Sequence, residues 1–278
     1  MFPRHPNPEN RPINIKRLVI ESPEPRAELP FDSERDITEE DWKMMQTELD
    51  KARRDGEHLR YITQAFPMKL LDPRLHITLS EENISEIREY PEQAKWAEFV
   101  YYFSQAKIID PSLPMSIDDY DDEYIGDYNT WAAIEDALAG EKNMVSSFIP
   151  LANAIRIIDT SVSIPIGEEM LQDCKKTLAQ YREEQIWTVF SAFAANLRLL
   201  CPSFDLKLSK EDWKGMHEEL DVVRRKNLSI IFAEHAANMS ILAAEKVEIT
   251  DQGIQLTMPK RKQDLKTQIP PIPEPKKF

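Results

Sequence analysis

One phrase of this sequence is written twice. EEDWKMMQTELDKARR runs from Glu39 to Arg54, and KEDWKGMHEELDVVRR runs from Lys210 to Arg225, 171 residues later. An apolar residue and a hydroxyl residue precede each copy, which suits a helix N-cap. The Trp four positions after that cap suits a hydrophobic staple. A phrase that recurs in one chain predicts a repeat architecture.

The same helix start occurs at three more places between the two copies. Each has an apolar residue, a potential cap, and an apolar or aromatic residue four positions later. The five caps are Thr38, Ser80, Ser116, Gly167 and Ser209, at spacings of 42, 36, 51 and 42 residues. Five units of about 42 residues are therefore predicted.

A second pattern later in each unit gives the same register. In four units it is anchored on a basic residue, and Ser240 takes that place in the fifth. An aromatic residue stands eight positions before the anchor, and an apolar pair follows at or just after it. These offsets lie on one side of a helix, so each unit is predicted to be a helical hairpin. The basic anchors are Lys69, Lys107, Arg156 and Arg198.

The segments between hairpins alternate apolar and polar residues, as in Leu75, Ile77 and Leu79. This period predicts extended backbone, either as short strands or as linkers. After the fifth unit, residues 247–258 allow two interpretations. They form a partial sixth helical unit that Pro259 ends, or a β-hairpin that turns at 251–253.

The predicted fold is all-α: a right-handed α-solenoid of about five helical hairpins with short extended connectors and a terminal β-hairpin or capping turn. By its period and pattern it resembles the HEAT and armadillo class of helical repeats. The resemblance covers roughly 36–246. Composition and pattern together predict a disordered Pro-rich arm (1–35), a helical repeat domain (36–258) and a disordered basic Pro-rich tail (259–278). The predicted units are 37–76, 77–114, 115–163, 164–205 and 206–246, with a partial cap at 247–258.

Charge and composition narrow the partners. The formal charge is −14, and residues 36–258 carry −18 because the first 35 residues are neutral and the last 20 carry +4. An acidic body repels nucleic acid and anionic membranes, so only the basic tail is a candidate for nucleic-acid contact. Two Cys, the lack of a secretory signal pattern and the lack of a long apolar run favour the cytoplasm.

No pattern for catalysis or for a cofactor emerges. The five His show no metal-ligand spacing, and no nucleotide-binding or hydrolase motif occurs. The acidic segment 116–131 fails as a calcium loop, since Ala132 takes the place of the required Glu. It leaves weak candidate metal ligands, which are Asp118, Asp119, Asp121, Asp122 and Glu123.

Two sets of residues are candidates for partner binding. Lys69, Lys107, Arg156 and Arg198 share a repeat position and would form a basic ladder; alternatively they stabilise the C-terminal ends of their helices through the dipole. The second set stands in the acidic segment, as a contact loop or a solvated loop: Tyr120, Tyr124 and Tyr128.

These features predict a non-enzymatic protein–protein interaction scaffold or accessory subunit. One alternative is a divalent-cation-dependent enzyme or cation-binding protein that uses residues 118–123. A second is a nucleic-acid-associated protein that makes contact through the tail, 259–278.

Overall fold

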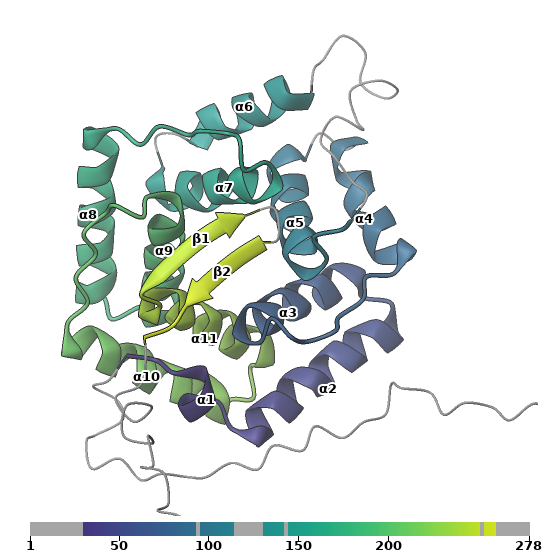
Figure 1. Ribbon diagram of the computed structural model, residues 1–278, viewed down its shortest axis with the longest axis horizontal. Helices are drawn as coiled ribbons and strands as arrows, with labels where there is room; N and C mark the ends of the chain where they lie inside the picture. The colour runs from purple at the N-terminus through teal and green to yellow at the C-terminus, as the bar shows by residue number, and fades with distance from the viewer. Residues whose placement is uncertain (1–29, 93–94, 114–129, 142–143, 251–252, 260–278) are drawn as a thin grey trace, which may run out of the picture.

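The computed structural model describes residues 30–92, 95–113, 130–141, 144–250 and 253–259 (Figure 1). The described part is mostly helical, so the predicted all-α class is confirmed. Its elements are α1 (Ser33–Asp36), α2 (Glu39–Asp55), α3 (His58–Leu71), α4 (Glu81–Glu92), α5 (Trp96–Ile109), α6 (Thr130–Glu141), α7 (Val145–Ile158), α8 (Glu168–Glu183), α9 (Trp187–Leu200), α10 (Lys210–Arg225), α11 (Ser229–Ala243), β1 (Lys246–Thr250) and β2 (Gly253–Thr257).

From α2 onward the described helices pair as hairpins, α2 with α3 through to α10 with α11. The second helices of these hairpins, α3, α5, α7, α9 and α11, pack side by side and form an inner layer. Each first helix lies outside this layer, against its own partner and the preceding inner helix, as α4 lies against α5 and α3. Figure 1 shows the outer helices around the inner ones.

The inner layer is closed. α11 packs against α9 on one side and α3 on the other, and α2 contacts α11 as well as α3. The first and last hairpins are therefore neighbours, and the described hairpins form a ring, so the predicted right-handed solenoid is not confirmed. The difference arises because the rotation between successive hairpins depends on three-dimensional packing, which the repeat period does not encode.

Helix starts follow the capping chemistry in the sequence. The hydroxyls of Thr38 and Ser209 accept hydrogen bonds from the amides of Asp41 and Asp212, whose carboxylates accept in return from the cap amides. Each arrangement is a complete capping box. Gly167 caps α8 without a side chain, and Ser116 lies outside the described residues.

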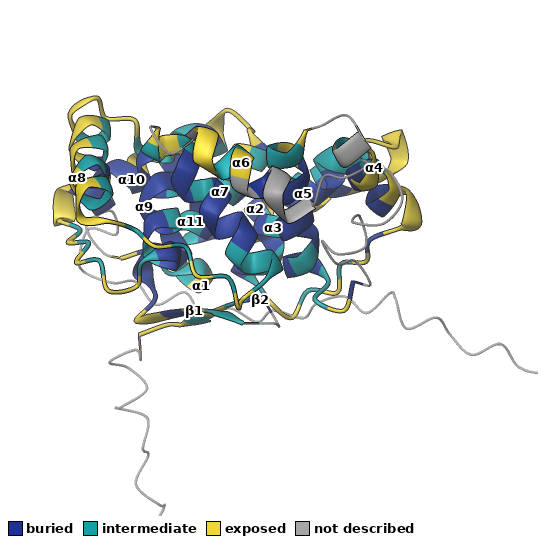
Figure 2. Ribbon diagram, turned by 90° about the horizontal axis from the view of Figure 1, so that it is seen from above, coloured by how far each residue is buried: buried dark blue, intermediate teal, exposed yellow. Residues whose placement is uncertain are grey.

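The core lies within the inner layer and between the two layers (Figure 2). The aromatic residue eight positions before each anchor is buried in every hairpin: Tyr61, Phe99, Phe148, Phe190 and Phe232. The inner helices are apolar on several faces because they touch neighbours on several sides. This explains why they carry most of the buried residues.

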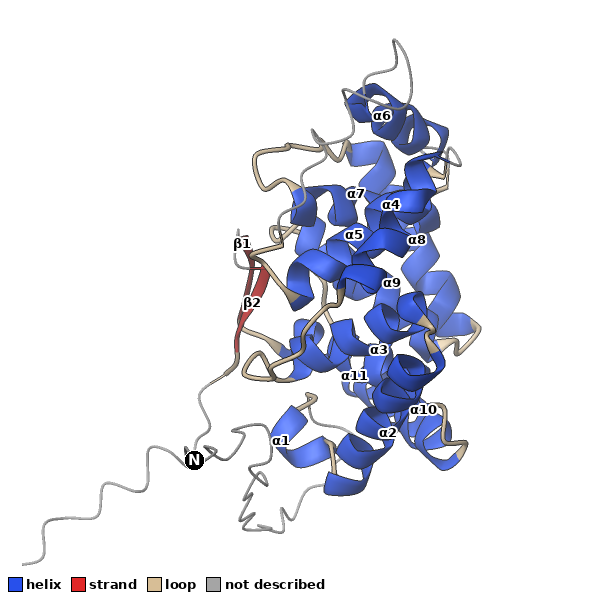
Figure 3. Ribbon diagram, turned by 90° about the vertical axis from the view of Figure 1, so that its right-hand side faces the viewer, coloured by secondary structure: helices blue, strands red, loops and turns tan. Residues whose placement is uncertain are grey.

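The C-terminal hairpin covers one end of the ring (Figure 3). β1 contacts α7 and α9, β2 contacts α5, and the strands are antiparallel, with Val247 opposite Leu256 and Ile249 opposite Ile254. These apolar residues pack against the core. Gly253 begins β2 at φ +91°, and a Cβ there would lie 3.8 Å from the Cα of Ile108. The β-hairpin alternative is confirmed, and the partial sixth helical unit is wrong.

Two further predictions need correction or completion. The described structure already includes a buried Phe31 and the helix α1, so the ordered part begins inside the range 1–35 predicted as an arm. The described connectors form no strands, although Leu79 is buried and Leu75 and Ile77 pack against the core. They are extended linkers.

Among the described helices, none has the length and apolarity that crossing a membrane requires.

Candidate interaction surface

Exposed large apolar side chains gather at the ring end opposite the β-hairpin. Seven such side chains are exposed in the described part of the chain, and six lie at or just after the starts of inner helices. The seventh, Met258, follows β2. A cluster of this kind marks a contact site, whereas single exposed apolar residues are ordinary. We call the six residues the apolar mouth: Tyr101 (42% exposed), Met144 (55%), Ile186 (37%), Val189 (42%), Leu228 (40%) and Ile231 (42%).

Three residues of the mouth occupy equivalent places. Met144, Ile186 and Leu228 are the N-cap residues of α7, α9 and α11. Each carbonyl accepts from the amide four residues later, at 2.8–2.9 Å, but no side chain caps its helix. Ser, Thr, Asp or Asn at an N-cap stabilises a helix by about 1 kcal/mol relative to an apolar residue. An apolar residue at the N-cap therefore stabilises its helix less than a polar one would. It leaves an exposed apolar side chain of the apolar mouth on each of three adjacent hairpins.

Tyr101 and Glu234 occupy equivalent places on the inner side of the apolar mouth, and the charge of Glu234 acts on Tyr101. Both stand six positions before the anchor of their hairpin, Tyr101 on α5 and Glu234 on α11. These helices flank α3 in the ring, so side chains that interact between them do so over the ring axis. Desolvation raises the pKa of Tyr101 to about 12, with a smaller effect from the charge of Glu234. Desolvation alone raises the pKa of Glu234 to about 7.

Gln105 lies one helical turn deeper than Tyr101 on the same face of α5. It is 2% exposed, and at ordinary hydrogen-bond distances and angles neither its amide nitrogen nor its amide oxygen has a partner. A loose hydrogen bond between Gln105 and the Tyr101 hydroxyl lowers the pKa of that group, against the larger effect of desolvation. A buried amide that is so poorly paired is unusual, because an unsatisfied buried amide costs about 1–3 kcal/mol.

The other end of the ring carries a cavity of about 400 Å³ beneath the β-hairpin. Leu70 and Leu71 of α3, Ser240 of α11 and Ile254 and Leu256 of β2 line it. Its lining is mostly apolar and holds no charged side chain. The cavity therefore offers no group for acid–base or metal chemistry.

The four basic anchors all bind backbone carbonyls near helix C-termini. Lys69 donates to Pro73 and Leu75, both at 2.8 Å, and Lys107 reaches Leu113 at 3.5 Å. These two side chains hold the turn that follows their own helix.

The two arginines reach the next hairpin instead. Arg156 of α7 donates to the carbonyls of Leu199 (3.4 Å) and Leu200 (3.0 Å) at the end of α9. Arg198 donates to Leu242 (2.5 Å) and to Ala244 at the end of α11. The interpretation as helix-end partners accounts for these contacts. The basic ladder stays a prediction, with Arg198 half-buried and already engaged.

The acidic segment falls outside the described residues. This applies to the candidate metal ligands Asp118, Asp119, Asp121, Asp122 and Glu123 and to the candidate contact residues Tyr120, Tyr124 and Tyr128. The basic tail, 260–278, is outside them as well. The cation-dependent and nucleic-acid alternatives therefore stay predictions.

Histidine and cysteine have structural surroundings in the described ranges. His235 is 1% exposed; its Nδ1 lies 2.7 Å from the Ser191 hydroxyl and its Nε2 lies 2.9 Å from the Met216 carbonyl. Desolvation lowers the pKa of His235 to about 4, and burial raises the pKa of Cys174 to about 11. In the described part no three His, Cys, Asp or Glu side chains stand together as metal ligands.

Glu234, Gln105 and the residues of the apolar mouth were not singled out from the sequence. A signal was present for Glu234, because it is the one carboxylate in the mostly apolar helix SIIFAEHAANMSILA. No comparable signal existed for Gln105, because the burial of its amide depends on how the hairpins close into a ring. A comparison with protein families finds no matching family model, and comparisons with curated proteins and with solved structures find no match either.

Proposed function

We propose that this protein is a non-enzymatic protein–protein interaction scaffold or accessory subunit, a helical repeat array closed into a ring, that binds its partner at the apolar mouth. The observation that supports this most directly is the placement, among the described residues, of six of the seven exposed large apolar side chains at one end of the ring. We include a cytoplasmic location in the proposal.

The proposal commits to a partner that is apolar and positively charged. The mouth supplies aliphatic and aromatic surface, and residues 36–258 carry a net charge of −18. Opposite charge speeds encounter and disfavours acidic partners, while apolar burial supplies most of the affinity. A basic amphipathic segment of another protein satisfies both requirements.

A peptide selection tests the proposal. Immobilised protein is offered a phage-displayed library of random peptides, and parallel selections use the variant Ile186→Ser/Leu228→Ser/Ile231→Ser. We expect enriched peptides with aliphatic or aromatic residues and Lys or Arg, which bind the triple variant at least about tenfold more weakly because interface anchors carry most of the energy.

Met258→Ser is the matched control, because it removes an exposed apolar side chain from the opposite end. Peptides that bind the triple variant as well as the unmodified protein would overturn the proposal, as would enrichment of acidic peptides. Sedimentation velocity completes the test: a dimer that the triple variant abolishes would make a second copy of this chain the occupant.

A further inference from the structure

We propose that Glu234, Tyr101 and Gln105 form a binding site on the ring axis for a primary alkylammonium group, such as the side chain of a lysine. This deepens the proposed function, on which it rests, by naming the partner group that enters the mouth.

The site begins with a layer of equivalent residues. One residue from each inner helix stands six positions before its anchor: Thr63, Tyr101, Pro150, Ala192 and Glu234. Each is exposed or partly exposed although the inner helices are otherwise mostly buried. Only Glu234 carries a charge, and Thr63, Pro150 and Ala192 are short. The layer therefore combines one carboxylate with a tyrosine and small neighbours.

Glu234 lacks a partner. In the described part of the chain its carboxylate makes no hydrogen bond or ion pair, and desolvation is the cause of its raised pKa. Burying a carboxylate without a counter-charge is unfavourable, and a cation brought to it restores the lost interaction. Few charged side chains in folded proteins are desolvated without a counter-charge. A carboxylate in such surroundings therefore points to a cationic ligand.

No cation of the described residues acts on Glu234, because desolvation is the one cause of its raised pKa. Arg60 on α3 pairs with Glu48 and Glu57, and Lys69 donates to carbonyls. Arg198 on α9 donates to carbonyls at the end of α11. The remaining titratable group that acts across the axis is Tyr101, whose pKa of about 12 keeps it neutral at physiological pH. Within the described part of the chain, Glu234 therefore has no counter-charge, and we assign that role to a partner's cation.

Gln105 is the second, independent observation. Its amide is nearly fully buried, has no partner at ordinary hydrogen-bond distances and angles, and interacts with the Tyr101 hydroxyl. An ammonium group has three N–H donors and no acceptor. The Glu234 carboxylate, the Gln105 Oε1 and the Tyr101 Oη provide three acceptors, and the tyrosine ring can also attract a cation through its face. The number and type of groups match.

The apolar mouth explains why the ammonium group should stand on an aliphatic stem. Ile231 precedes Glu234 by one helical turn, and Val189 holds the equivalent place on α9, with 42% of each side chain exposed. Methylene groups that pass these side chains would bury apolar surface on the way to the axis. Lysine fits this description better than arginine, whose planar guanidinium prefers a flat bidentate acceptor.

The test uses n-pentylamine as the probe, with 1-pentanol as its neutral counterpart, in calorimetric titrations near pH 7. We expect saturable binding of the amine and a Kd at least about tenfold higher for Glu234→Gln, since a charge-assisted hydrogen bond is lost. Tyr101→Phe should weaken binding less, because the ring remains. Glu183→Gln removes an exposed carboxylate at the end of α8 and is the matched control, with an unchanged Kd.

A second readout separates this role from a structural one. A cation at Glu234 lowers the pKa of its carboxyl, so binding near pH 7 releases protons, and the apparent enthalpy changes with the ionisation enthalpy of the buffer. Glu234→Gln should abolish this buffer dependence. Equal binding of n-pentylamine by the unmodified protein and Glu234→Gln, or no saturable binding at millimolar concentration, would overturn the proposal.

The two proposals fail in different ways. If selected peptides need the mouth but not Glu234, the scaffold stands and the ammonium site is wrong. If n-pentylamine binds through Glu234 while no peptide needs the mouth, the site stands as one for a small amine and the scaffold is wrong. Peptides that require Arg where Lys fails would also overturn the ammonium assignment.

Discussion

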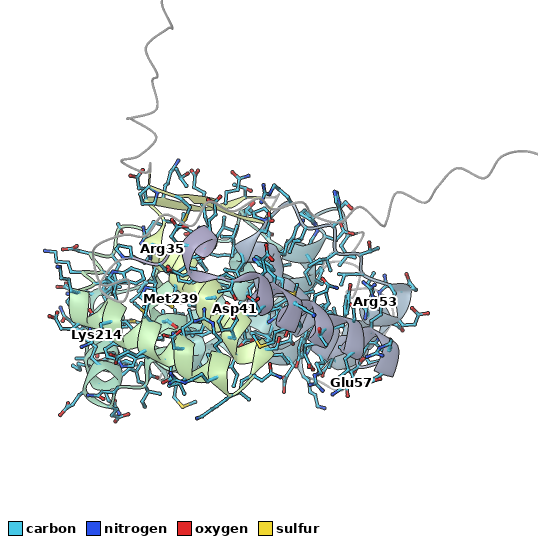
Figure 4. The ribbon with its side chains drawn as sticks, turned by 90° about the horizontal axis from the view of Figure 1, so that it is seen from below. Arg35, Asp41, Arg53, Glu57, Lys214 and Met239 are labelled. Atoms are coloured by element: carbon cyan, nitrogen blue, oxygen red, sulfur yellow. The ribbon has the colours of Figure 1, made fainter. Side chains whose placement is uncertain are left out.

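Arg224 and Asp41 are 183 residues apart in the chain, yet the Nε of Arg224 lies 2.8 Å from the Oδ1 of Asp41. Asp41 lies where the first helices meet the last ones (Figure 4). The same contact joins neighbouring hairpins elsewhere, since the Nε of Arg182 lies 2.8 Å from the Oδ1 of Asp212. Both arginines also lie over the aromatic ring of the following inner helix, Phe232 or Phe190. The junction between the chain's ends thus uses the chemistry of an internal junction.

Removing either arginine should therefore lower the free energy of unfolding by a similar amount, but the local loosening should occur in different helices. Arg224→Ala and Arg182→Ala leave Asp41 and Asp212 buried without their cations, which should lower the free energy of unfolding by about 2–4 kcal/mol. Hydrogen exchange should increase in α2 and α11 for Arg224→Ala and in α8 and α10 for Arg182→Ala. An Arg224→Ala variant with unchanged protection in α2 would contradict closure through this contact.

Gly215 is required by a close approach. A Cβ at this position would lie 2.2 Å from Cε2 of Trp187, so Gly215→Ala forces the indole to move. We expect a loss of about 1–3 kcal/mol in urea unfolding, as for other overpacked sites. Gly140→Ala is the control in an exposed helix, where nothing lies within 4 Å and alanine should stabilise by up to about 1 kcal/mol. If Gly215→Ala and Gly140→Ala changed the free energy of unfolding equally, the Trp187 indole would be able to move aside at no cost, and the prediction would be wrong.

Glu234 and His235 have opposite effects on the pH dependence of stability. Folding raises the pKa of Glu234 from 4.5 to about 7, so the folded state keeps a proton that the unfolded state releases, and stability falls as pH rises through this range. Folding lowers the pKa of His235 from 6.5 to about 4, so stability rises as pH increases from about 4 to 6.5. The two contributions oppose each other in their shared range.

Glu234→Gln should remove one of these two opposing contributions to the pH dependence of stability. Relative to the unmodified protein, the variant should gain about 1 kcal/mol of stability per pH unit between pH 5 and 7, because it lacks the carboxyl that must ionise. Urea unfolding at several pH values measures the difference. A pH-independent difference would contradict the raised pKa of Glu234.

Arg198 should matter more for stability than Lys107. It is half-buried and binds two carbonyls at the end of α11, whereas Lys107 makes one long contact of 3.5 Å. Arg198→Ala should cost about 1–3 kcal/mol in thermal or urea unfolding, and Lys107→Ala less than about 1 kcal/mol. Unchanged melting of Arg198→Glu together with loss of peptide binding would instead support the basic ladder.

The repeated tryptophans should differ. Trp213 is 6% exposed, so Trp213→Ala should cost about 3–5 kcal/mol. Trp42 is only partly buried, and the same change there should cost less. Urea unfolding of both variants gives the comparison, and a larger loss at Trp42 would contradict the exposure in the structure.

The helices could be predicted because their signals are local. Thr38 and Ser209 indicate helix starts because their hydroxyls cap the helices. The aromatic residue eight positions before each anchor indicates the buried face of each inner helix. Closure was missed because no local signal reports the angle between hairpins. The pairs Arg224–Asp41 and Arg182–Asp212 occupy equivalent places in the repeat. The end units of an open array have polar outer faces without such partners, so an equivalent pair between the first and last hairpins is a mark of closure.

Closure of the ring has a consequence for chain connectivity. Ser33 and Met258 line the same cavity, so the first and last described segments lie together on one side. A short linker could join them, and new termini could be opened at the exposed connector around Ser203 without separating any two hairpins that touch. The ring thus has the geometry of a circularly permutable protein, in which the order of the hairpins in space does not depend on where the polypeptide begins.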